Sequence, residues 1–256
     1  MKDVVIDLHA RESSKGAKNG VTDYRKSKEP GISVRFLFEC SIKLNQKPLT
    51  SAMAAVVFHR FFKETDKANY DEFLIAASAL YLAGKLKDDP VKIRDVINVT
   101  HNTLNRGSAP LELDDEYWAF RDAIIQAELL ITRMLKFDLS TVHPHKYMLH
   151  YMKSLQGWLG MSVWTNYPIA KTSAAFLQDF HHSPEILNFK PSHVAICCLS
   201  LAMQVFGVQV PLTNESDDST NWYNAFVSDL TKAQHWELSE KILKIYETTR
   251  DENKYF

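Results

Sequence analysis

The segment that decides the fold is DEFLIAASALYLAGK, residues 71–85. Apolar residues occupy nearly every side of a helix drawn through it, which is typical of a helix enclosed by neighbours rather than one lying on a surface. Small residues such as Ala76, Ala79 and Ala83 allow those neighbours to approach closely. The segment therefore predicts the central helix of an all-helical core.

A second segment, PSHVAICCLSLAMQVFGV at residues 191–208, has the same character. Four small and large residues of the first segment recur in it 119 positions later, as Ala195, Leu199, Leu201 and Ala202. The preceding segment also recurs, with Ala52, Phe58 and Phe62 matched 118 positions later by Ala170, Phe176 and Phe180. A duplicated unit is the economical interpretation. Chance matching between Ala- and Leu-rich helices is the alternative.

A helical period dominates outside these segments too, and no stretch shows the sustained alternation of a half-buried strand. We expect an all-α protein of two tandem five-helix repeats, with prolines such as Pro48, Pro90 and Pro110 in the gaps. The predicted helices are 34–43, 51–64, 71–85, 92–104, 114–136, 144–159, 169–180, 191–208, 222–230 and 236–248.

The expected domains follow from this pattern. Residues 1–31, rich in Lys, Ser and Gly, are expected to be a flexible tail, and 251–256 a second tail. The two repeats are expected at 32–140 and 141–250. Between them, Ser140 and Thr141 are candidate helix caps, and Pro144 suits a first helical turn.

Composition limits the classes of function. The chain has 256 residues, is 45% apolar, and carries a formal net charge of -1. No global field draws such a chain to nucleic acid or to a membrane surface, so protein partners are expected. The most apolar window, 193–206, is shorter than the roughly twenty residues of a membrane span.

Cysteine usage and the N-terminus indicate a location. Three cysteines, two of them adjacent, suit neither a disulfide framework nor a metal-binding pair, so no cofactor is expected. The first residues lack the apolar region of a signal peptide. We expect a nuclear and cytoplasmic protein.

Two charged residues stand out as site candidates. Lys85 ends the first central helix, whereas the second copy has Gln204 at the matching place. A cation in the last turn, where it favours the helix dipole, is the simplest interpretation of Lys85. Glu128 lies among apolar residues of its own helix, where an isolated buried carboxylate is costly. It either reaches water, pairs with Thr132 or Arg121, or forms an interface charge.

At these residues the chain resembles the cyclin family. The resemblance extends from about residue 32 to 250, and the lysine and the glutamate are its most diagnostic pair. The strings that carry it are Arg35-Phe36-Leu37, the helix 51–64, Leu82-Ala83-Gly84-Lys85-Leu86, Glu128-Leu129-Leu130 and Leu135-Lys136-Phe137-Asp138-Leu139.

The resemblance implies a non-enzymatic subunit that forms a heterodimer with a cyclin-dependent protein kinase and activates it. By resemblance, Lys85 and Glu128 lie within a few ångströms of one another on the kinase-facing surface and hydrogen-bond to the main chain leading into the kinase αC helix. Leu82 and Leu86 supply apolar contact. The glutamate of αC then meets the β3 lysine of the kinase and the activation loop moves away, both preconditions for phosphoryl transfer. Local strings near residues 143–147, 204–208 and 229–232 imply cyclin-dependent kinase ten as the partner.

Ser41 bears on how substrates would be recruited. Several cyclins dock substrates through a first-helix tryptophan, and Ser41 occupies that place here, which puts this role in doubt.

The same duplicated fold occurs in DNA-binding transcription factors of the TFIIB type, but no basic face or zinc ribbon is visible. For an all-α enzyme, the candidate constellations are the histidines at 143, 145 and 150 and the pair His181–His182 with Asp179, and no catalytic motif accompanies either. We expect His181 and His182 to lie in a polar loop.

Overall fold

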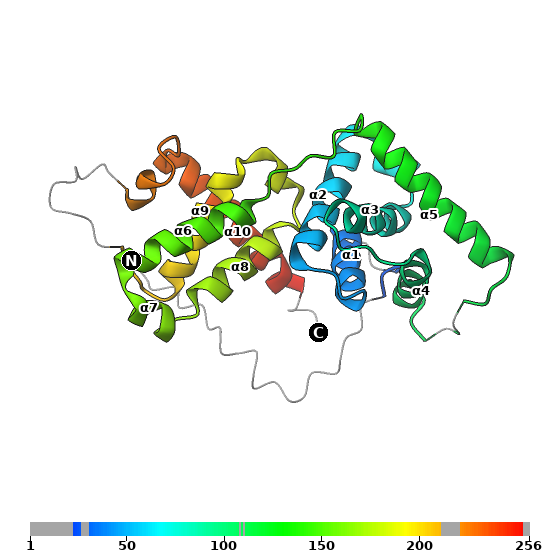
Figure 1. Cartoon of the computed structure of the whole chain (residues 1–256), viewed down its shortest axis with the longest axis horizontal. Helices are drawn as coiled ribbons and strands as arrows, with labels where there is room; N and C mark the ends of the chain where they lie inside the picture. Colours follow the sequence, from blue (N-terminus) through cyan, green and yellow to red (C-terminus); the bar gives the residue numbers. More distant parts are fainter. Residues whose placement is uncertain (1–22, 27–30, 108, 110, 211–220, 253–256) are drawn as a thin grey trace. The chain divides into compact units, whose positions relative to one another are not determined.

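The computed structural model describes residues 23–26, 31–107, 109, 111–210 and 221–252, the last five without side-chain detail. These residues form α-helices and short 3₁₀-helices, and no strand occurs among them (Figure 1). The predicted all-α class is confirmed. In chain order the elements are α1 (Ile32–Lys43), α2 (Pro48–Glu64), η2 (Lys67–Asn69), α3 (Glu72–Leu86), α4 (Ile93–Leu104), α5 (Asp115–Met134), α6 (Pro144–Leu159), α7 (Met161–Asn166), α8 (Ile169–Phe180), η3 (Pro184–Asn188), α9 (Pro191–Val205), η4 (Trp222–Ala225) and α10 (Lys232–Glu252).

Side-chain caps set several helix starts. The Asp71 carboxylate accepts hydrogen bonds from the N–H groups of Phe73 and Leu74, which otherwise have no partner in the first turn of α3. Asp114 caps α5 in the same way. Pro48 opens α2 three residues before the predicted start, since its missing N–H is no loss in a first turn.

The first compact unit contains residues 23–143 and 178–190. Its central helix is α3, which packs against α1, α2, α4 and α5 (Figure 1). Ala76, Leu80 and Ala83 have no exposed surface, as expected for an enclosed helix. The long helix α5 lies alongside α3 and α4.

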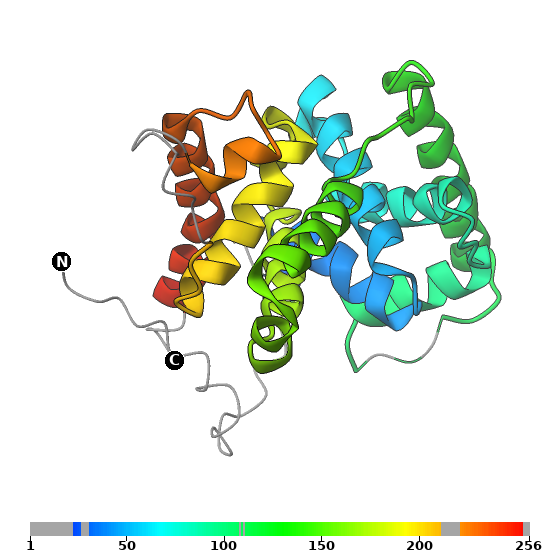
Figure 2. The same ribbon diagram turned by 60° about the vertical axis from the view of Figure 1, so that its left-hand side comes forward.

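The second compact unit contains residues 144–177 and, from 191 onward, α9, η4 and α10. Its central helix is α9, which packs against both α6 and α10 (Figure 2). The residues of α9 from His193 to Met203 are all buried. Each unit thus has one nearly fully enclosed helix at the position that the sequence predicted.

A short N-terminal segment packs onto the first unit. Tyr24 is buried although it falls in the expected flexible tail. Its hydroxyl donates a hydrogen bond to Glu39, and its ring meets the rings of Phe36 and Phe73 edge to face. Arg106 donates to both oxygens of the same glutamate. Residues 1–22 and 253–256 of the expected tails lie outside the described residues.

Three parts of the structure differ from expectation. The predicted helix 222–230 is only the single turn η4, and α7 was not predicted. His181 and His182 are not in a polar loop: the His181 carbonyl accepts a hydrogen bond from the buried Nε2 of His59, and the His182 ring packs on Phe38. Because of such contacts, 178–190 groups with the first unit.

Two general properties complete the fold. No described helix is long and apolar enough to cross a bilayer. Cys40, Cys197 and Cys198 are all buried as free thiols. Burial raises the pKa of Cys40 and of Cys197 to about 12, and that of Cys198 in the same direction.

Candidate partner-binding site

The predicted pair of Lys85 and Glu128 is present in the first unit. Lys85 Nζ lies 2.7 Å from Oε1 and 2.9 Å from Oε2 of Glu128, although 43 positions separate the two residues. This contact explains how a carboxylate with only 13% of its side chain exposed is tolerated on an apolar helix. Thr132 instead donates to the Leu129 carbonyl, and Arg121 pairs with Asp122. The expected proximity of the pair is confirmed.

An aromatic ring, not foreseen from the sequence, holds the lysine from a second side. Lys85 Nζ lies 4.0 Å from the centroid of the Tyr81 ring, one helical turn earlier on α3. A cation over an aromatic face is stabilised by about 0.5–1 kcal/mol at exposed sites. The ammonium is therefore fixed between a carboxylate and a ring, while 46% of the Lys85 side chain remains exposed.

Gly84 permits the tight turn beside this pair. A Cβ atom at Gly84 would lie 2.9 Å from the Asp89 carbonyl oxygen and 3.2 Å from Nε2 of Gln46. The Asp89 carboxylate in turn accepts hydrogen bonds from the Lys47 N–H and the Thr50 hydroxyl, and these bonds lower its pKa. The turn that follows α3 is thus tied to the start of α2.

The two leucines assigned to the site have different positions. Leu86 is 36% exposed and lies next to Lys85, so it can supply apolar contact area. Leu82 is 5% exposed and belongs to the core of the first unit. Its side chain supports the last turn of α3 from inside and offers almost no contact area.

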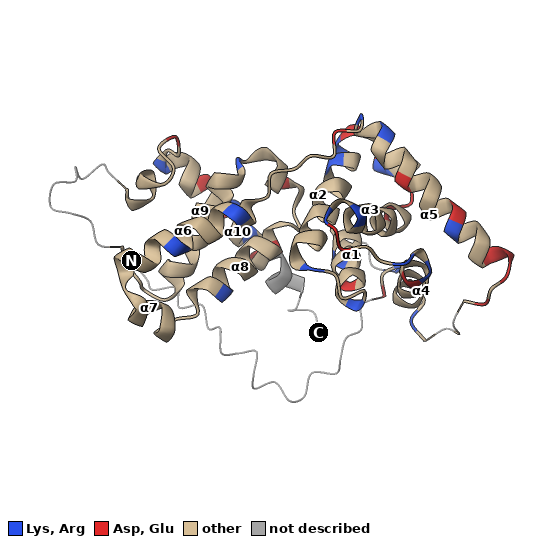
Figure 3. Ribbon diagram, viewed as in Figure 1, with Lys and Arg blue, Asp and Glu red and all other residues tan. Residues whose placement is uncertain are grey.

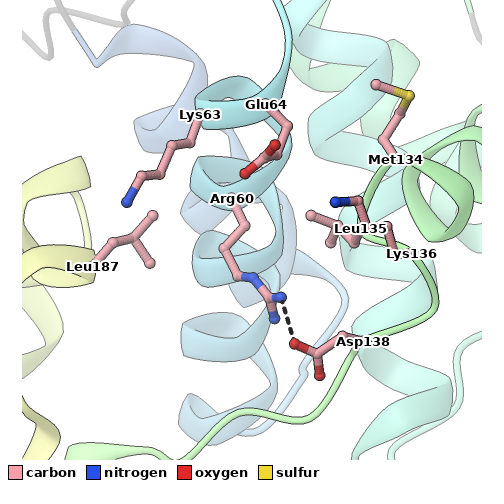
Figure 4. A pocket seen from close by; sticks show the side chains of 8 residues that line it. All are labelled: Arg60, Lys63, Glu64, Met134, Leu135, Lys136, Asp138 and Leu187. Carbon is pink, nitrogen blue, oxygen red and sulfur yellow. Dashed lines mark hydrogen bonds and ion pairs between the residues drawn. The ribbon is translucent and has the colours of Figure 1, made fainter.

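A cavity of about 350 Å³ lies elsewhere in the first unit, between the end of α2, the end of α5 and η3 (Figure 4). Arg60 reaches across it to the Asp138 carboxylate at 3.0 Å. Hydrogen bonds from Ser140, which has the larger effect, and from Arg60 lower the pKa of Asp138. Lys63, Glu64 and Lys136 also line the cavity, so its charges are mixed. No catalytic arrangement of nucleophile and base occurs among these residues.

Ser41, which by resemblance replaces a substrate-docking tryptophan, is fully buried on α1. Its hydroxyl lies 2.6 Å from that of Ser51 and 3.2 Å from Oε1 of Gln46. The side chain therefore links α1 to α2 internally and cannot form an exposed aromatic patch.

The family model for the cyclin N-terminal domain matches residues 9–140, slightly more than half of the chain. This chain belongs to the cyclin family. The matched part contains α1 to α5 and both residues of the Lys85–Glu128 pair.

Curated relatives of this cyclin carry cyclin names. Cyclin-T1-3 from Oryza sativa subsp. japonica is 27% identical over 93% of the chain, and cyclin-L1 from Danio rerio is 29% identical over 80%. The chain spans less than half the length of these relatives, 47% and 39% respectively.

Two solved structures share the fold of this cyclin. A chain of the yeast RNA Pol II CTD kinase CTDK-1 complex matches 86% of it with a TM-score of 0.66 at 16% identity, and 66% of that chain is covered. A chain of the CAK complex from Chaetomium thermophilum matches 83% with a TM-score of 0.59 at 16% identity, and 60% of that chain is covered. At this identity the likeness establishes the two-repeat cyclin fold.

Proposed function

We propose that this cyclin is a non-catalytic subunit that binds and activates a cyclin-dependent protein kinase. The observation that carries the proposal is the Lys85–Glu128 pair, which lies at the surface beside the exposed Leu86. A partner main chain can accept from the remaining N–H bonds of the ammonium and donate to the carboxylate. Charge-assisted bonds of this kind contribute roughly 1.5–3 kcal/mol each when sheltered from water.

The mechanism requires no chemistry on this chain. Binding energy released at the pair and at Leu86 favours the kinase conformation whose αC helix is turned inward over the conformation in which it is not. With αC inward, its glutamate meets the β3 lysine of the kinase, and the activation loop clears the active site. Kinase activity then appears only in the complex.

The proposal extends to the subfamily of this cyclin and to the kinase that it binds. Local strings near residues 143–147, 204–208 and 229–232 resemble cyclin Q, whose partner is cyclin-dependent kinase ten. We take that kinase as the partner and expect no direct contact with nucleic acid or membrane. Structural similarity to a chain of an RNA Pol II CTD kinase complex favours a nuclear location, and no finding favours the cytoplasm.

The experiment is a binding and activation assay with purified cyclin-dependent kinase ten. Lys85→Ala and Glu128→Ala should each weaken association by about tenfold or more, equivalent to about 1.4 kcal/mol. Glu128→Ala should change the melting temperature little, because the Lys85 ammonium that it leaves is 46% exposed to water. Lys85→Ala leaves the Glu128 carboxylate, only 13% exposed, without its partner and should lower the melting temperature further, so its affinity is measured at a temperature where circular dichroism shows it folded. Fluorescence titration and a peptide phosphorylation assay measure the two quantities.

Gln204→Ala is the matched control, since it removes the residue at the corresponding position of the second repeat. Its kinase affinity should equal that of the parent chain. If both pair variants also bind and fully activate the kinase at limiting concentration, the site is wrong. Substrate phosphorylation without any added kinase would overturn the non-catalytic assignment.

A further inference from the structure

The outward face of α6 in the second unit carries a stripe of basic and apolar residues, none of which belongs to the Lys85–Glu128 site. Pro144, Met148, Tyr151 and Leu155 face the core, and α6 packs there against α9. The opposite positions, spaced three and four residues apart as on one helical face, are Lys146, Leu149, His150, Lys153 and Gly157. All five are exposed.

The charge of this region has a single sign. Residues 139–178 contain three lysines and no Asp or Glu, in a chain with 31 acidic residues. Figure 3 shows only basic colouring on α6. Among the residues with described side chains, none forms an ion pair with Lys146 or Lys153. The two ammonium groups thus carry unneutralised charge on the surface.

Large apolar side chains accompany these charges. Leu149 is 67% exposed, and beyond the end of α6 Met161 is 66% exposed. Gln156, seven positions after Leu149 and so on the same face of α6, donates from Nε2 to the Met161 sulfur at 3.0 Å, which holds the start of α7 beside this face. Side chains held in this way lose little conformational freedom when a partner covers them.

We propose that the outward face of α6 is a docking surface for an acidic peptide segment of a partner protein that also carries large apolar side chains. The carboxylates of such a segment would pair with Lys146 and Lys153, and its apolar side chains would cover Leu149 and Met161. Leu149 and Gln156, whose side chain contacts Met161, are seven positions apart, about 10 Å along a helix, a span that a short peptide can reach.

The apolar character of the stripe favours a peptide over nucleic acid. Single-stranded nucleic acid is bound by aromatic platforms on which bases stack, together with a groove of positive charge. Here the two most exposed apolar groups are aliphatic or thioether side chains, Leu149 and Met161. Side chains of this kind match the leucines and phenylalanines of an amphipathic peptide.

The test uses the full chain and a labelled synthetic peptide of about twelve residues, in which Asp and Glu alternate with Leu and Phe. Fluorescence anisotropy should detect saturable binding. The double variant Lys146→Glu/Lys153→Glu should weaken it by about tenfold or more, and Leu149→Ser by about threefold or more. All three positions are exposed, so circular dichroism and melting temperature should be unchanged.

The matched control is Lys63→Glu/Lys232→Glu, which changes the net charge equally on α2 and α10. It should bind the peptide within about twofold of the parent chain. Equal weakening by the two double variants would mean a net-charge effect and overturn the proposal. So would equal binding of a peptide with serine in place of Leu and Phe, or tighter binding of an oligouridylate of similar length. The outcome does not depend on the kinase.

Discussion

Helices α3 and α9 share a packing pattern and differ at their last turn. Their matched residues are buried to the same degree: Leu80 and Leu199 have no exposed surface, and Leu82 and Leu201 are each 5% exposed. At the end, Gly84 and Lys85 of α3 correspond to Met203 and Gln204 of α9. The shared residues therefore build the repeat, and the changed residues belong to the candidate site.

The same comparison extends one turn back. In α3, Lys85 is held by Tyr81 at the i, i+4 spacing, and in α9 Gln204 lies 3.5 Å from the hydroxyl of Ser200 at the same spacing. Both repeats thus use a side chain one turn earlier to hold the residue at the helix end. Only α3 adds a charge and an acidic partner from another helix.

The largest effect should come from the shared core. Leu80→Ala and Leu199→Ala should each lower the free energy of unfolding by about 2–5 kcal/mol, because both remove a fully buried isobutyl group and leave a cavity. Urea denaturation followed by circular dichroism measures the loss. The exposed Leu149→Ala is the control and should stay within about 0.5 kcal/mol. A loss below about 1 kcal/mol for either buried leucine would break the equivalence.

The second effect is a pH dependence of stability that the first repeat owes to a buried histidine. His59 on α2 matches Leu177 on α8, and burial lowers the pKa of His59 from 6.5 to about 4. At a pH between these two pKa values, the unfolded chain binds more protons than the folded chain. Stability is thus complete above about pH 6.5 and falls as pH drops to about 4, by at most about 3 kcal/mol.

His59→Leu, which copies the second repeat, should flatten this part of the stability profile. Urea denaturation at a series of pH values compares the two chains. Burial lowers the pKa of His145, His182 and His235 as well, so some dependence should remain in the variant. Identical slopes in the parent and the variant would show that His59 is not responsible.

The third effect contrasts two helical glycines. Gly84→Ala should lower the free energy of unfolding by about 1–3 kcal/mol, because the added methyl group meets the Asp89 backbone carbonyl. Gly157→Ala on α6 should raise it by about 0.4–1 kcal/mol, since a Cβ there has no atom within 4 Å. Thermal unfolding distinguishes the two signs. Stabilisation by Gly84→Ala would contradict the close approach.

The smallest effect concerns Tyr81 and rests on the proposed kinase binding. Tyr81→Leu removes the ring beneath Lys85 and should weaken kinase association about two- to fivefold. Tyr81→Phe keeps the ring and should bind like the parent chain. Weakening by Tyr81→Phe as large as that by Tyr81→Leu would indicate a role of the hydroxyl instead. If Lys85→Ala also leaves the kinase affinity unchanged, the Lys85–Glu128 pair is not the kinase-binding site.

The sequence predicted the long helices well because their apolar period is strong. It failed where the period is short or interrupted. The region 222–230 contains enough apolar residues for a helix, but only one 3₁₀ turn forms there. The start of α10 at Lys232 could have been found: Thr231 and Gln234 each accept a hydrogen bond from the other's backbone N–H, a capping box visible as T-x-x-Q.

The candidate site was predictable in its charges but not in its surroundings. Glu128 is a carboxylate on an apolar helix, so a partner was expected for it. Lys85 stood out because the second repeat has Gln204 at the matching position. Tyr81 carries no comparable signal, because an aromatic residue within an enclosed helix is ordinarily part of the core. The burial of Leu82, one turn from the exposed Leu86, likewise depends on how α3 is oriented among its neighbours.

The buried thiols make this chain convenient for site-specific labelling. With the pKa of Cys40 and of Cys197 near 12, and that of Cys198 also raised, almost no thiolate is present at neutral pH, and the sulfur atoms are shielded from reagents. A maleimide dye should therefore react selectively with one cysteine introduced on the surface. Lys153→Cys and Gln204→Cys would report separately on the α6 face and the end of α9, with all native cysteines retained.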